Sequence, residues 1–324
     1  MFLGVDGGGS KTAFALVDGA GNVLAQHEEG GSYHVEVGID GVAGVLARGC
    51  AALFGAARIS PGDVTFAFLG LPAYGEDRAA DPLLDELPYA VLGHRRYLCG
   101  NDMVCSWAGS LACADGISVI AGTGSMAYGE LAGRRARSGG WGELFSDEGS
   151  AYWIARAGLA LFSRMSDGRA PRGPLHELMR RTLALRDDLD LCGVVYGDMQ
   201  GERSRIAALA PLVTQAAALG DPQAAGVLAA AGVELADMVD AVRAALGAAP
   251  DARVPVSYTG GLFGRDGPLR SAFADALAAR AQPYRLAPPR LAPVLGAALY
   301  AARTVGSPLD DGAVERLVDQ HRGD

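Results

Sequence analysis

Lysine is nearly absent from this sequence, and so are the patterns that define several other protein classes. Of 28 basic residues only one is a lysine, Lys11, and the formal net charge is −9. This acidic balance gives no support to nucleic-acid binding. Apolar stretches are interrupted by Gly, Asp or Glu well before the ~18 residues that a membrane span requires, so we expect no membrane segment. The chain starts MFLGVDGG, without a basic region, so we expect no secretory signal.

Cysteine is also scarce, and its five copies show no pairing pattern. No two cysteines form a CxxC motif, and the closest spacings match no common zinc pattern. An odd number without a framework favours free thiols in a reducing, cytoplasmic protein. We expect these residues to behave as small buried hydrophobes: Cys50, Cys99, Cys105, Cys113 and Cys192.

What the chain does contain is enough apolar sequence for a large core and an excess of glycine. Half of its 324 residues are apolar and a fifth are charged, which predicts a soluble globular protein with two domains. The 46 glycines occur in short clusters without a period. Such clusters indicate tight turns, some of them at places where the backbone approaches a ligand.

The first third of the chain has the pattern of a small α/β domain. Residues 1–28 contain three β-type runs separated by two glycine turns, and GAGN at 19–22 is typical of a hairpin. We therefore expect an antiparallel three-strand meander with a glycine loop at its first turn. The elements expected after it are a helix at 40–57, a buried strand at 64–72, a helix from about Glu76, a strand at 95–102 and a helix at 103–114.

The same pattern restarts near residue 116, which suggests two similar halves joined near 113–116. A cleft between two such halves is a common place for ligands. The expected elements are a strand, glycine turn and strand at 116–131, a glycine loop leading into a helix at 136–162, mostly helical sequence at 175–247 with breaks at Gly193–Gly201 and Gly220–Pro222, a strand into a double-glycine turn at 254–264, and helices at 267–280 and 294–303.

The glycine turn near the N-terminus has the composition of a phosphate-binding loop. It is no Walker A loop, because Lys11 comes one residue too late and a strand follows it. Backbone N–H groups of a glycine hairpin can still bind phosphate oxygens, and Asp6 at the strand end could hold Mg²⁺ through water. The alternative is an ordinary glycine hairpin. The candidate phosphate ligands are Gly8, Gly9, Ser10, Lys11 and Thr12.

A second small-residue hairpin, Gly122-Thr123-Gly124-Ser125, lies between two predicted strands of the second half. By itself it is as typical of a plain turn as of a ligand loop. Together with the first hairpin it suggests a clamp that binds a triphosphate from two lobes.

Several motifs occur in an order that resembles a known family: GVDGGGSKT, ND at 101–102, IAGTGS at 120–125, GGWGELFSDEGSAYWIA at 139–155 and YTGG at 258–261. Over residues 1–303 they resemble the N-acetylglucosamine kinase branch of the BadF/BadG/BcrA/BcrD ATPase family, in the actin–hexokinase–Hsp70 superfamily. The resemblance implies an α/β fold of two actin/ribonuclease H-like lobes. Each lobe would be a mixed five-stranded sheet flanked by helices, with a cleft between the lobes.

The domain boundaries expected from this resemblance divide the chain near residue 115. Residues 1–114 would form the N-terminal lobe, and a C-terminal helix at about 305–324 would pack back on it. Residues 115–304 would form the C-terminal lobe, with a helical insertion at about 160–250. The resemblance also implies a homodimer.

The resemblance assigns roles to residues in each half. Asp102 matches the general base, although an N-cap on the helix from Met103 is the other interpretation of this aspartate. Nucleotide contacts are implied for Thr123, Gly124, Gly260 and Gly261. Sugar contacts are implied for Asp102, Ser125, Gly140, Trp141, Gly142 and Asp147.

One loop departs from the pattern of the family. Where relatives usually have an Asn, this chain has Ser32 or Tyr33, depending on a one-residue gap, so either one is the candidate sugar ligand. Neither carries the amide that both donates and accepts, which leaves the preference for an N-acetyl group open. His34 could also bond a sugar hydroxyl, or could be a loop histidine without a special role.

The activity implied by the resemblance is an ATP-dependent sugar kinase, a phosphotransferase with an alcohol acceptor. It would use ATP and Mg²⁺ and transfer the γ-phosphoryl group to the 6-hydroxyl of an amino sugar, N-acetylglucosamine or glucosamine. One alternative is an ATPase that activates a partner redox enzyme, which would require well-placed cysteine thiolates for a bridging cluster. The other is a sensor that binds sugar or nucleotide without catalysis.

Overall fold

The protein consists of two compact units, each built on a mixed five-stranded sheet. The computed structural model describes residues 1–264 and 267–323, so Asp324, the end of the expected C-terminal segment, lies outside the described residues. The first unit comprises Met1–Asp115 and Pro288–Asp324, and the second comprises Gly116–Ala287. The expected fold class is confirmed.

The first sheet has the strand order β3-β2-β1-β4-β5. The antiparallel meander expected at residues 1–28 is present, and β4 and β5 extend it as parallel strands. The bounds are β1 (Phe2–Gly7), β2 (Lys11–Val17), β3 (Val23–Gly30), β4 (Phe66–Leu71) and β5 (Tyr97–Asn101).

The turn between β2 and β3 forms where the GAGN sequence predicts it. The Asp18 carboxylate accepts hydrogen bonds from the backbone N–H groups of Ala20 and Asn22, both at 2.9 Å. Gly21 has φ +82°, a left-handed conformation that glycine adopts without steric cost. These local bonds set the register in which β2 and β3 pair.

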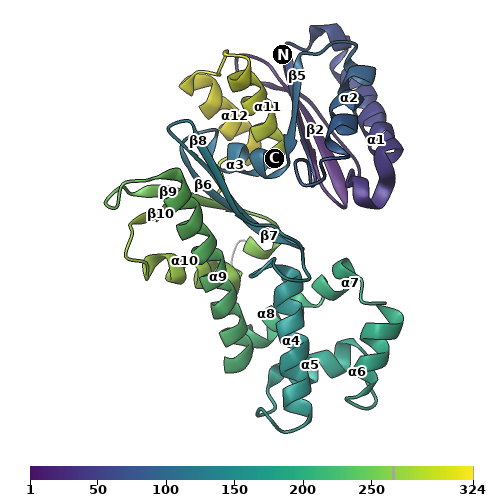
Figure 1. Ribbon diagram of the computed structural model, residues 1–324, viewed down its shortest axis with the longest axis vertical. Coiled ribbons are helices and arrows are strands. Elements are labelled where there is room, and N and C mark those ends of the chain that lie inside the picture. Colours follow the sequence, from purple (N-terminus) through teal and green to yellow (C-terminus); the bar gives the residue numbers. More distant parts are fainter. Residues whose placement is uncertain (265–266, 324) are drawn as a thin grey trace. The chain divides into compact units, whose positions relative to one another are not determined.

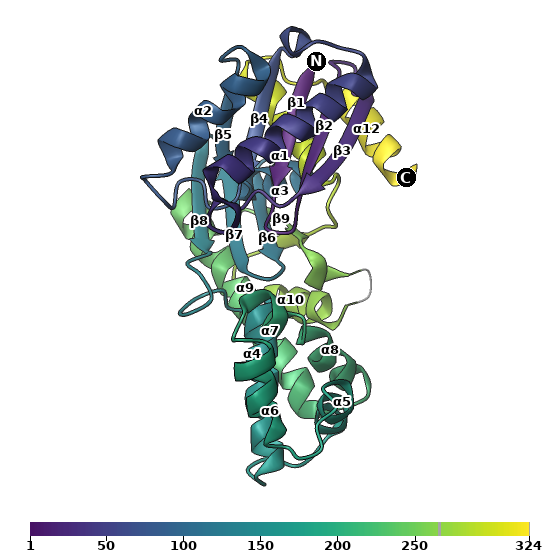
Figure 2. The same cartoon turned by 90° about the vertical axis from the view of Figure 1, so that its right-hand side faces the viewer.

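Helices cover both faces of the first sheet (Figure 1). One face carries α1 (His34–Ala57) and α2 (Asp81–Leu92), and the short 3₁₀ helix η1 (Pro61–Asp63) connects α1 to β4. The other face carries α3 (Met103–Leu111), α11 (Pro293–Thr304) and α12 (Asp311–Gly323). Figure 2 shows α1 and α2 lying across the strands. α1 begins earlier than expected and α2 later.

Helix α1 is long and apolar enough to cross a membrane by length and composition alone. Its packing is nevertheless that of a core helix in a sheet-and-helix layer. Val42, Leu46 and Leu53 are at most 1% exposed and belong to the core of the first unit. Glu36, Asp40 and Arg48 on its other side are exposed.

Helix α11 belongs to the first unit, which differs from the expected boundary at residue 304. By chain order α11 follows β10 as α3 follows β5, which is why the sequence pattern groups it with the second half. A Cβ on Gly296 of α11 would lie 2.0 Å from the backbone nitrogen of Gly109 in α3. A Cβ on Gly4 of β1 would lie 2.4 Å from the carbonyl oxygen of Val294. The glycines thus let α11 pack directly on α3 and β1.

The second sheet repeats the strand order of the first, β8-β7-β6-β9-β10. Its strands are β6 (Gly116–Ala121), β7 (Ser125–Leu131), β8 (Arg134–Gly139), β9 (Val254–Thr259) and β10 (Tyr284–Leu286). The sequence pattern did not predict β8 or β10. β8 is a polar edge strand of sequence RRARSG, and β10 has only three residues, so neither shows the alternation that marks a half-buried strand.

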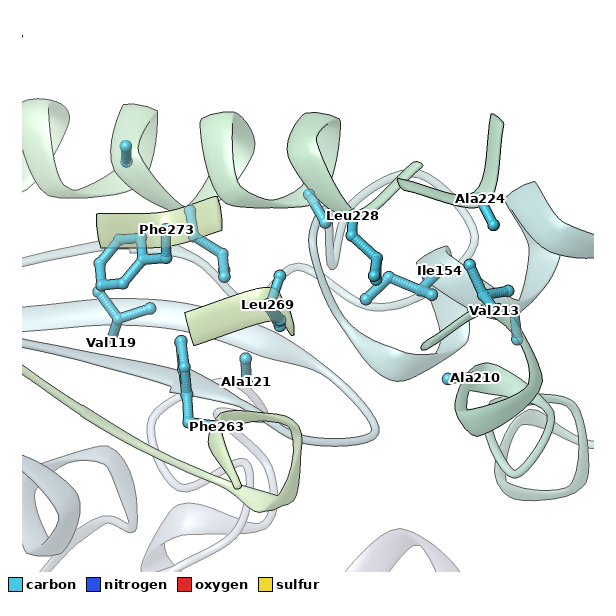
Figure 3. Packing of buried hydrophobic residues seen from close by; sticks show 14 of the residues in the cluster. Val119, Ala121, Ile154, Ala210, Val213, Ala224, Leu228, Phe263, Leu269 and Phe273 are labelled. Atoms are coloured by element: carbon cyan, nitrogen blue, oxygen red, sulfur yellow. The ribbon is translucent and has the colours of Figure 1, made fainter. Parts of the chain in front are cut away.

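A helical segment follows β8 and shares a core with the second sheet. It contains α4 (Ala151–Ser166), α5 (Pro174–Thr182), α6 (Asp190–Cys192), the π-helix η2 (Gly193–Asp198), α7 (Arg203–Ala207), α8 (Ala210–Ala218) and α9 (Pro222–Leu246), and the 3₁₀ helix η3 (Gly261–Phe263) and α10 (Pro268–Ala278) come after β9. In Figure 3, Phe273 lies beside Val119 of the sheet, and Val213 lies beside Ile154 of α4. This continuous core joins the helical segment to the second sheet.

Candidate active site

The parallel strands of the first sheet bring two carboxylates to one edge. Asp6 pairs with Gly70, and Leu71 pairs with Asn101, so β1, β4 and β5 end together. Asp6 lies at the end of β1, and Asp102 follows β5 directly. Ligands of open α/β sheets bind beyond the carboxyl ends of their parallel strands. This edge is therefore the candidate site of the first unit.

A glycine in β4 allows the start of α3 to lie against the sheet. A Cβ on Gly70 would be 2.2 Å from Sγ of Cys105 and 3.1 Å from Cα of Asp102. The Cys105 thiol also reaches the carbonyl oxygen of Val5 at 3.5 Å and donates to the Asp6 carboxylate. A larger residue at position 70 would displace the backbone that carries Asp102.

The two carboxyl groups have unusual protonation behaviour. Burial, with the nearby charge of Asp102 as the second cause, raises the pKa of Asp6 to about 8. Burial and the charge of Glu76 raise the pKa of Asp102 to about 7. Burial also raises the pKa of Cys105 well above its ordinary value, so this residue remains a thiol that can donate to Asp6. A carboxylate with a pKa near neutrality is suited to accept a proton from a substrate.

Asn101 rather than Asp102 caps helix α3. The Asn101 side-chain oxygen accepts from the backbone nitrogen of Met103 at 3.1 Å, whereas the Asp102 side chain makes no capping bond. The Asn101 amide donates to the carbonyl oxygen of Tyr74 at 3.1 Å and to a Glu76 carboxylate oxygen at 3.5 Å. Asp102 thus occupies the N-cap position of α3 without a side-chain capping bond.

The glycine hairpin between β1 and β2 lies at the same edge. Gly8 is half-buried, while Gly9 and Ser10 are exposed. A Cβ on Gly9 would meet no atom within 4 Å, so the fold itself does not require glycine there. Lys11 is exposed and pairs with Glu28 at 2.6 Å.

Two of the predicted ligands, Thr12 and Ser32, hold loops together in this structure. Both are buried, and the Thr12 hydroxyl donates to the Ser32 hydroxyl at 2.9 Å. The backbone nitrogen of Ser32 donates to the carbonyl oxygen of Gly8 at 3.0 Å. A Cβ on Gly31 would lie 1.9 Å from the carbonyl oxygen of Gly9. The loop after β3 is thus packed directly against the hairpin, with Tyr33, which is half-buried, as its next residue.

The second hairpin, residues 122–125, is bound to the start of α4. Backbone nitrogens of Ala151 and Tyr152 donate to the carbonyl oxygens of Gly122 and Thr123 at 2.8 and 3.4 Å. Thr123 is exposed. Ser125 is buried, and its hydroxyl donates to the carbonyl oxygen of Glu148 at 2.6 Å.

The loop after β8 places Asp147 beneath this hairpin. Gly140 and Gly142 have φ of +70° and +98°, and Asp147 itself has φ +60°, a conformation uncommon for residues other than glycine. Asp147 is 2% exposed. Burial raises its pKa, and the neighbouring Arg203 guanidinium opposes that rise. Non-glycine residues held in this conformation cluster at functional sites.

Arg203 is a site residue that the sequence analysis missed. Its guanidinium donates to the Asp147 carboxylate, and its Nε lies 3.5 Å from a carboxylate oxygen of Glu143. A Cβ on Gly124 would lie 2.4 Å from Nη2 of Arg203. Arg203 therefore contacts both the hairpin and the loop. Asp147 and Arg203 are 56 positions apart in the sequence, and no local motif links them.

The same loop exposes three large apolar side chains. Trp141, Leu144 and Phe145 are 67%, 80% and 76% exposed. The Arg137 guanidinium lies 5.7 Å from the centre of the Trp141 ring. An exposed indole in the loop that carries Asp147 is suited to pack on the face of a sugar ring.

The double-glycine turn after β9 ends beside the hairpin of residues 122–125, because β6 and β9 are parallel neighbours. Gly260 has φ +103°, and its Cβ would lie 2.2 Å from the carbonyl oxygen of Ala121. The fold therefore requires glycine at 260. Gly261 is exposed, and its Cβ would meet no atom within 4 Å.

Comparison with known proteins identifies the family. The model of the BadF/BadG/BcrA/BcrD ATPase family matches residues 3–301. The chain belongs to this family. The predicted family resemblance is thus confirmed.

Two curated relatives of this chain are named as sugar kinases. The N-acetyl-D-glucosamine kinase of Dictyostelium discoideum is 30% identical over 93% of this chain and 97% of its own length. The N-acetylmuramic acid/N-acetylglucosamine kinase of Clostridium acetobutylicum is 31% identical over 74% of this chain and 78% of its own. A crystal structure of a candidate N-acetylglucosamine kinase from Chromobacterium violaceum has a TM-score of 0.70 and 27% identity, covering 92% of this chain and 98% of that one.

Proposed function

We propose that this ATP-dependent carbohydrate kinase transfers the γ-phosphoryl group of ATP to the 6-hydroxyl of an amino sugar, with Asp102 as the general base. The observation that carries the proposal is the position of Asp102. Its carboxylate makes no capping bond to α3 and lies at the carboxyl edge of the first sheet, beside Asp6 and the glycine hairpin. Its pKa of about 7 lies close to working pH, where a general base is most effective.

The transfer then requires little covalent chemistry from the protein. The sugar 6-oxygen attacks the γ-phosphorus, the bond from phosphorus to the bridging oxygen breaks, and ADP leaves with that electron pair. Asp102 takes the hydroxyl proton. Positioning and charge stabilisation supply most of the acceleration in such reactions.

The carboxylates of the first unit fit Mg²⁺ held through water. Among the described residues no group of three or more His, Cys, Asp or Glu side chains could hold a metal ion directly. Magnesium usually keeps several waters and takes one or two carboxylates together with substrate phosphates. Asp6 is the carboxylate proposed for this role, because the repulsion between Asp6 and Asp102 would be relieved by a cation. When bound, Mg²⁺ would neutralise charge on the phosphates.

We assign the phosphates to the exposed turn residues Gly8, Gly9 and Ser10 with Lys11. Because Glu28 already pairs with Lys11, phosphate would have to replace that carboxylate. In the second unit Thr123 and Gly124 are assigned to the phosphates. The turn at Gly260 and Gly261 is assigned to the adenosine, since a side chain at the open position 261 would meet the ligand and not the fold.

For the sugar we assign Asp147, Trp141 and the backbone of Gly140 and Gly142. Arg203 supports this assignment as a positioning residue, because it contacts the Asp147 carboxylate. Tyr33 remains a proposed ligand.

The buried hydroxyls of Thr12, Ser32 and Ser125 already have protein partners. We therefore propose that these three residues position the loops, rather than touching a ligand as the sequence analysis expected. A cytoplasmic homodimer also remains a proposal.

A panel of sugars tests the function. Coupled ADP release is measured with glucosamine, N-acetylglucosamine, N-acetylmannosamine, N-acetylmuramic acid and glucose at equal concentration, and phosphorus NMR locates the phosphate on the product. We expect the highest kcat/KM with an amino sugar and phosphate on its 6-oxygen. Sugar binding without turnover on any acceptor would refute the kinase and favour a sensor.

A further inference from the structure

His34 is a buried polar side chain without a hydrogen-bond partner. The residue is 8% exposed, and neither Nδ1 nor Nε2 has a partner within the described part of the chain. A buried polar atom without a partner has lost its hydrogen bonds to water and gained none in the protein, which destabilises the fold. Native proteins rarely accept that cost without a reason in function.

The loop that carries His34 is wedged between two parts of the candidate site. On one side it binds the glycine hairpin through the bond from Ser32 to Gly8. On the other side, Ser32 and the segment after β4 both lie close to Gly7. A Cβ on Gly7 would be 2.5 Å from Oγ of Ser32 and 2.8 Å from Cδ of Pro72. His34 therefore lies at the same edge of the first sheet as the carboxylates.

A shared turn connects His34 to the general base. Nε2 of His34 lies 3.9 Å from a carboxylate oxygen of Asp77, too far for a hydrogen bond. The preceding residue, Glu76, is held by Asn101 and acts electrostatically on Asp102. The imidazole and the Asp102 carboxylate thus flank the same Glu76–Asp77 turn.

The first turn of α1 is a separate element, which fixes His34 independently of the long helix. Gly38 has φ +72° and ψ 167° inside α1, so the helix is interrupted after Val37. The backbone nitrogens of Glu36 and Val37 both donate to the carbonyl oxygen of Tyr33. This short turn holds the imidazole at the site edge while the remainder of α1 packs on the sheet.

We propose that the His34 imidazole hydrogen-bonds a hydroxyl group of the acceptor sugar and so determines which acceptors are oriented toward Asp102. The inference rests on the proposed function and adds a specificity residue to it. A neutral imidazole offers one donor and one acceptor, and a sugar hydroxyl can satisfy both kinds of partner. The Ser32 hydroxyl is already bonded to Thr12. Besides Tyr33, the polar side chain that this loop can offer the sugar is therefore His34.

The test compares His34→Leu and His34→Gln with the wild type. The control is His27→Gln, because His27 lies in β3 and pairs with Glu29. KM for sugar, KM for ATP and kcat are measured with the best acceptor and with its 3-deoxy and 4-deoxy analogues. Sugar affinity without ATP is measured by calorimetry, and circular dichroism with thermal melts verifies folding.

We expect His34→Leu to raise the sugar KM about three- to tenfold, as the loss of one hydrogen bond implies. The ATP KM should change less than twofold, and His34→Gln should restore part of the affinity. For one deoxy sugar the wild type and His34→Leu should have the same KM, because the bond is already missing. The control should match the wild type throughout.

Three results would overturn the inference. The first is an unchanged sugar KM in a folded His34→Leu variant. The second is an equal loss on every deoxy sugar together with a higher ATP KM, which indicates a structural role. The third is a wild type that phosphorylates no sugar, which removes the proposed function as well, whereas the first two leave that function intact.

Discussion

Replacing Asp102 by Asn should abolish turnover and yet stabilise the protein. The amide cannot accept the hydroxyl proton, so we expect kcat to fall by several orders of magnitude while ATP still binds. The free energy of unfolding should rise, because the neutral amide avoids the cost of burying an ionised carboxylate. The rise in pKa from 3.8 to about 7 corresponds to at most about 4 kcal/mol. Because the structure around the new amide relaxes, we expect a net stabilisation of about 1–2 kcal/mol.

The sign depends on pH in a defined way. Because the folded pKa of Asp102 lies above the unfolded one, its contribution to stability is fully present below 3.8 and is lost as pH rises from there to about 7. The difference in melting temperature between Asp102→Asn and wild type should therefore be small near pH 4. At pH 8 it should be larger, about 2–5 °C in favour of the variant. In the wild type, kcat/KM should fall about tenfold per pH unit below that pKa.

Melting curves at both pH values, and coupled ADP-release kinetics on either side of the folded pKa, measure these effects. Asp275→Asn is the matched control, because Asp275 is exposed on α10, and it should change neither quantity. Near wild-type turnover of Asp102→Asn would show that Asp102 is not the base. A variant that melts lower than wild type at pH 8 would show that burial does not destabilise the ionised form of Asp102.

Three further substitutions distinguish residues that bind a ligand from residues that only stabilise the fold. Arg203→Ala should raise the sugar KM about tenfold with little change in the ATP KM, because Asp147 loses its charged partner. The control is Arg205→Ala, whose guanidinium donates to the backbone carbonyl oxygen of Asp198; it should leave both constants unchanged, and equal effects of the two variants would contradict this role. Gly9→Ala should leave the melting temperature unchanged but raise the ATP KM about tenfold, since the fold has space for the methyl group; an unchanged ATP KM would place the triphosphate elsewhere. Gly226→Ala, at an exposed position of α9, should stabilise the protein by about 0.5–1 kcal/mol in denaturant titrations without altering kinetics, and a destabilised variant would contradict the helical assignment.

Local patterns were sufficient to predict the elements that depend on neighbouring residues. The β1–β2–β3 meander was predictable because alternation and the 19–22 turn act within a few residues. β8 was not predictable from RRARSG, because only pairing with β7 makes that polar segment a strand. The place of α11 was also hidden, since it depends on close contact between glycines of α11 and α3.

The sequence by itself determined the first β-meander, the glycine hairpins and the identity of Asp6 and Asp102 as candidate site residues. Their motifs are contiguous, and carboxyl ends of parallel strands must meet at one edge. Only the tertiary structure decided which polar groups remain available there. It pairs Thr12 with Ser32, transfers the capping of α3 to Asn101, brings Arg203 to Asp147 and buries His34 without a partner. These outcomes depend on side chains from distant segments that compete for the same hydrogen bonds, and no local pattern encodes that competition.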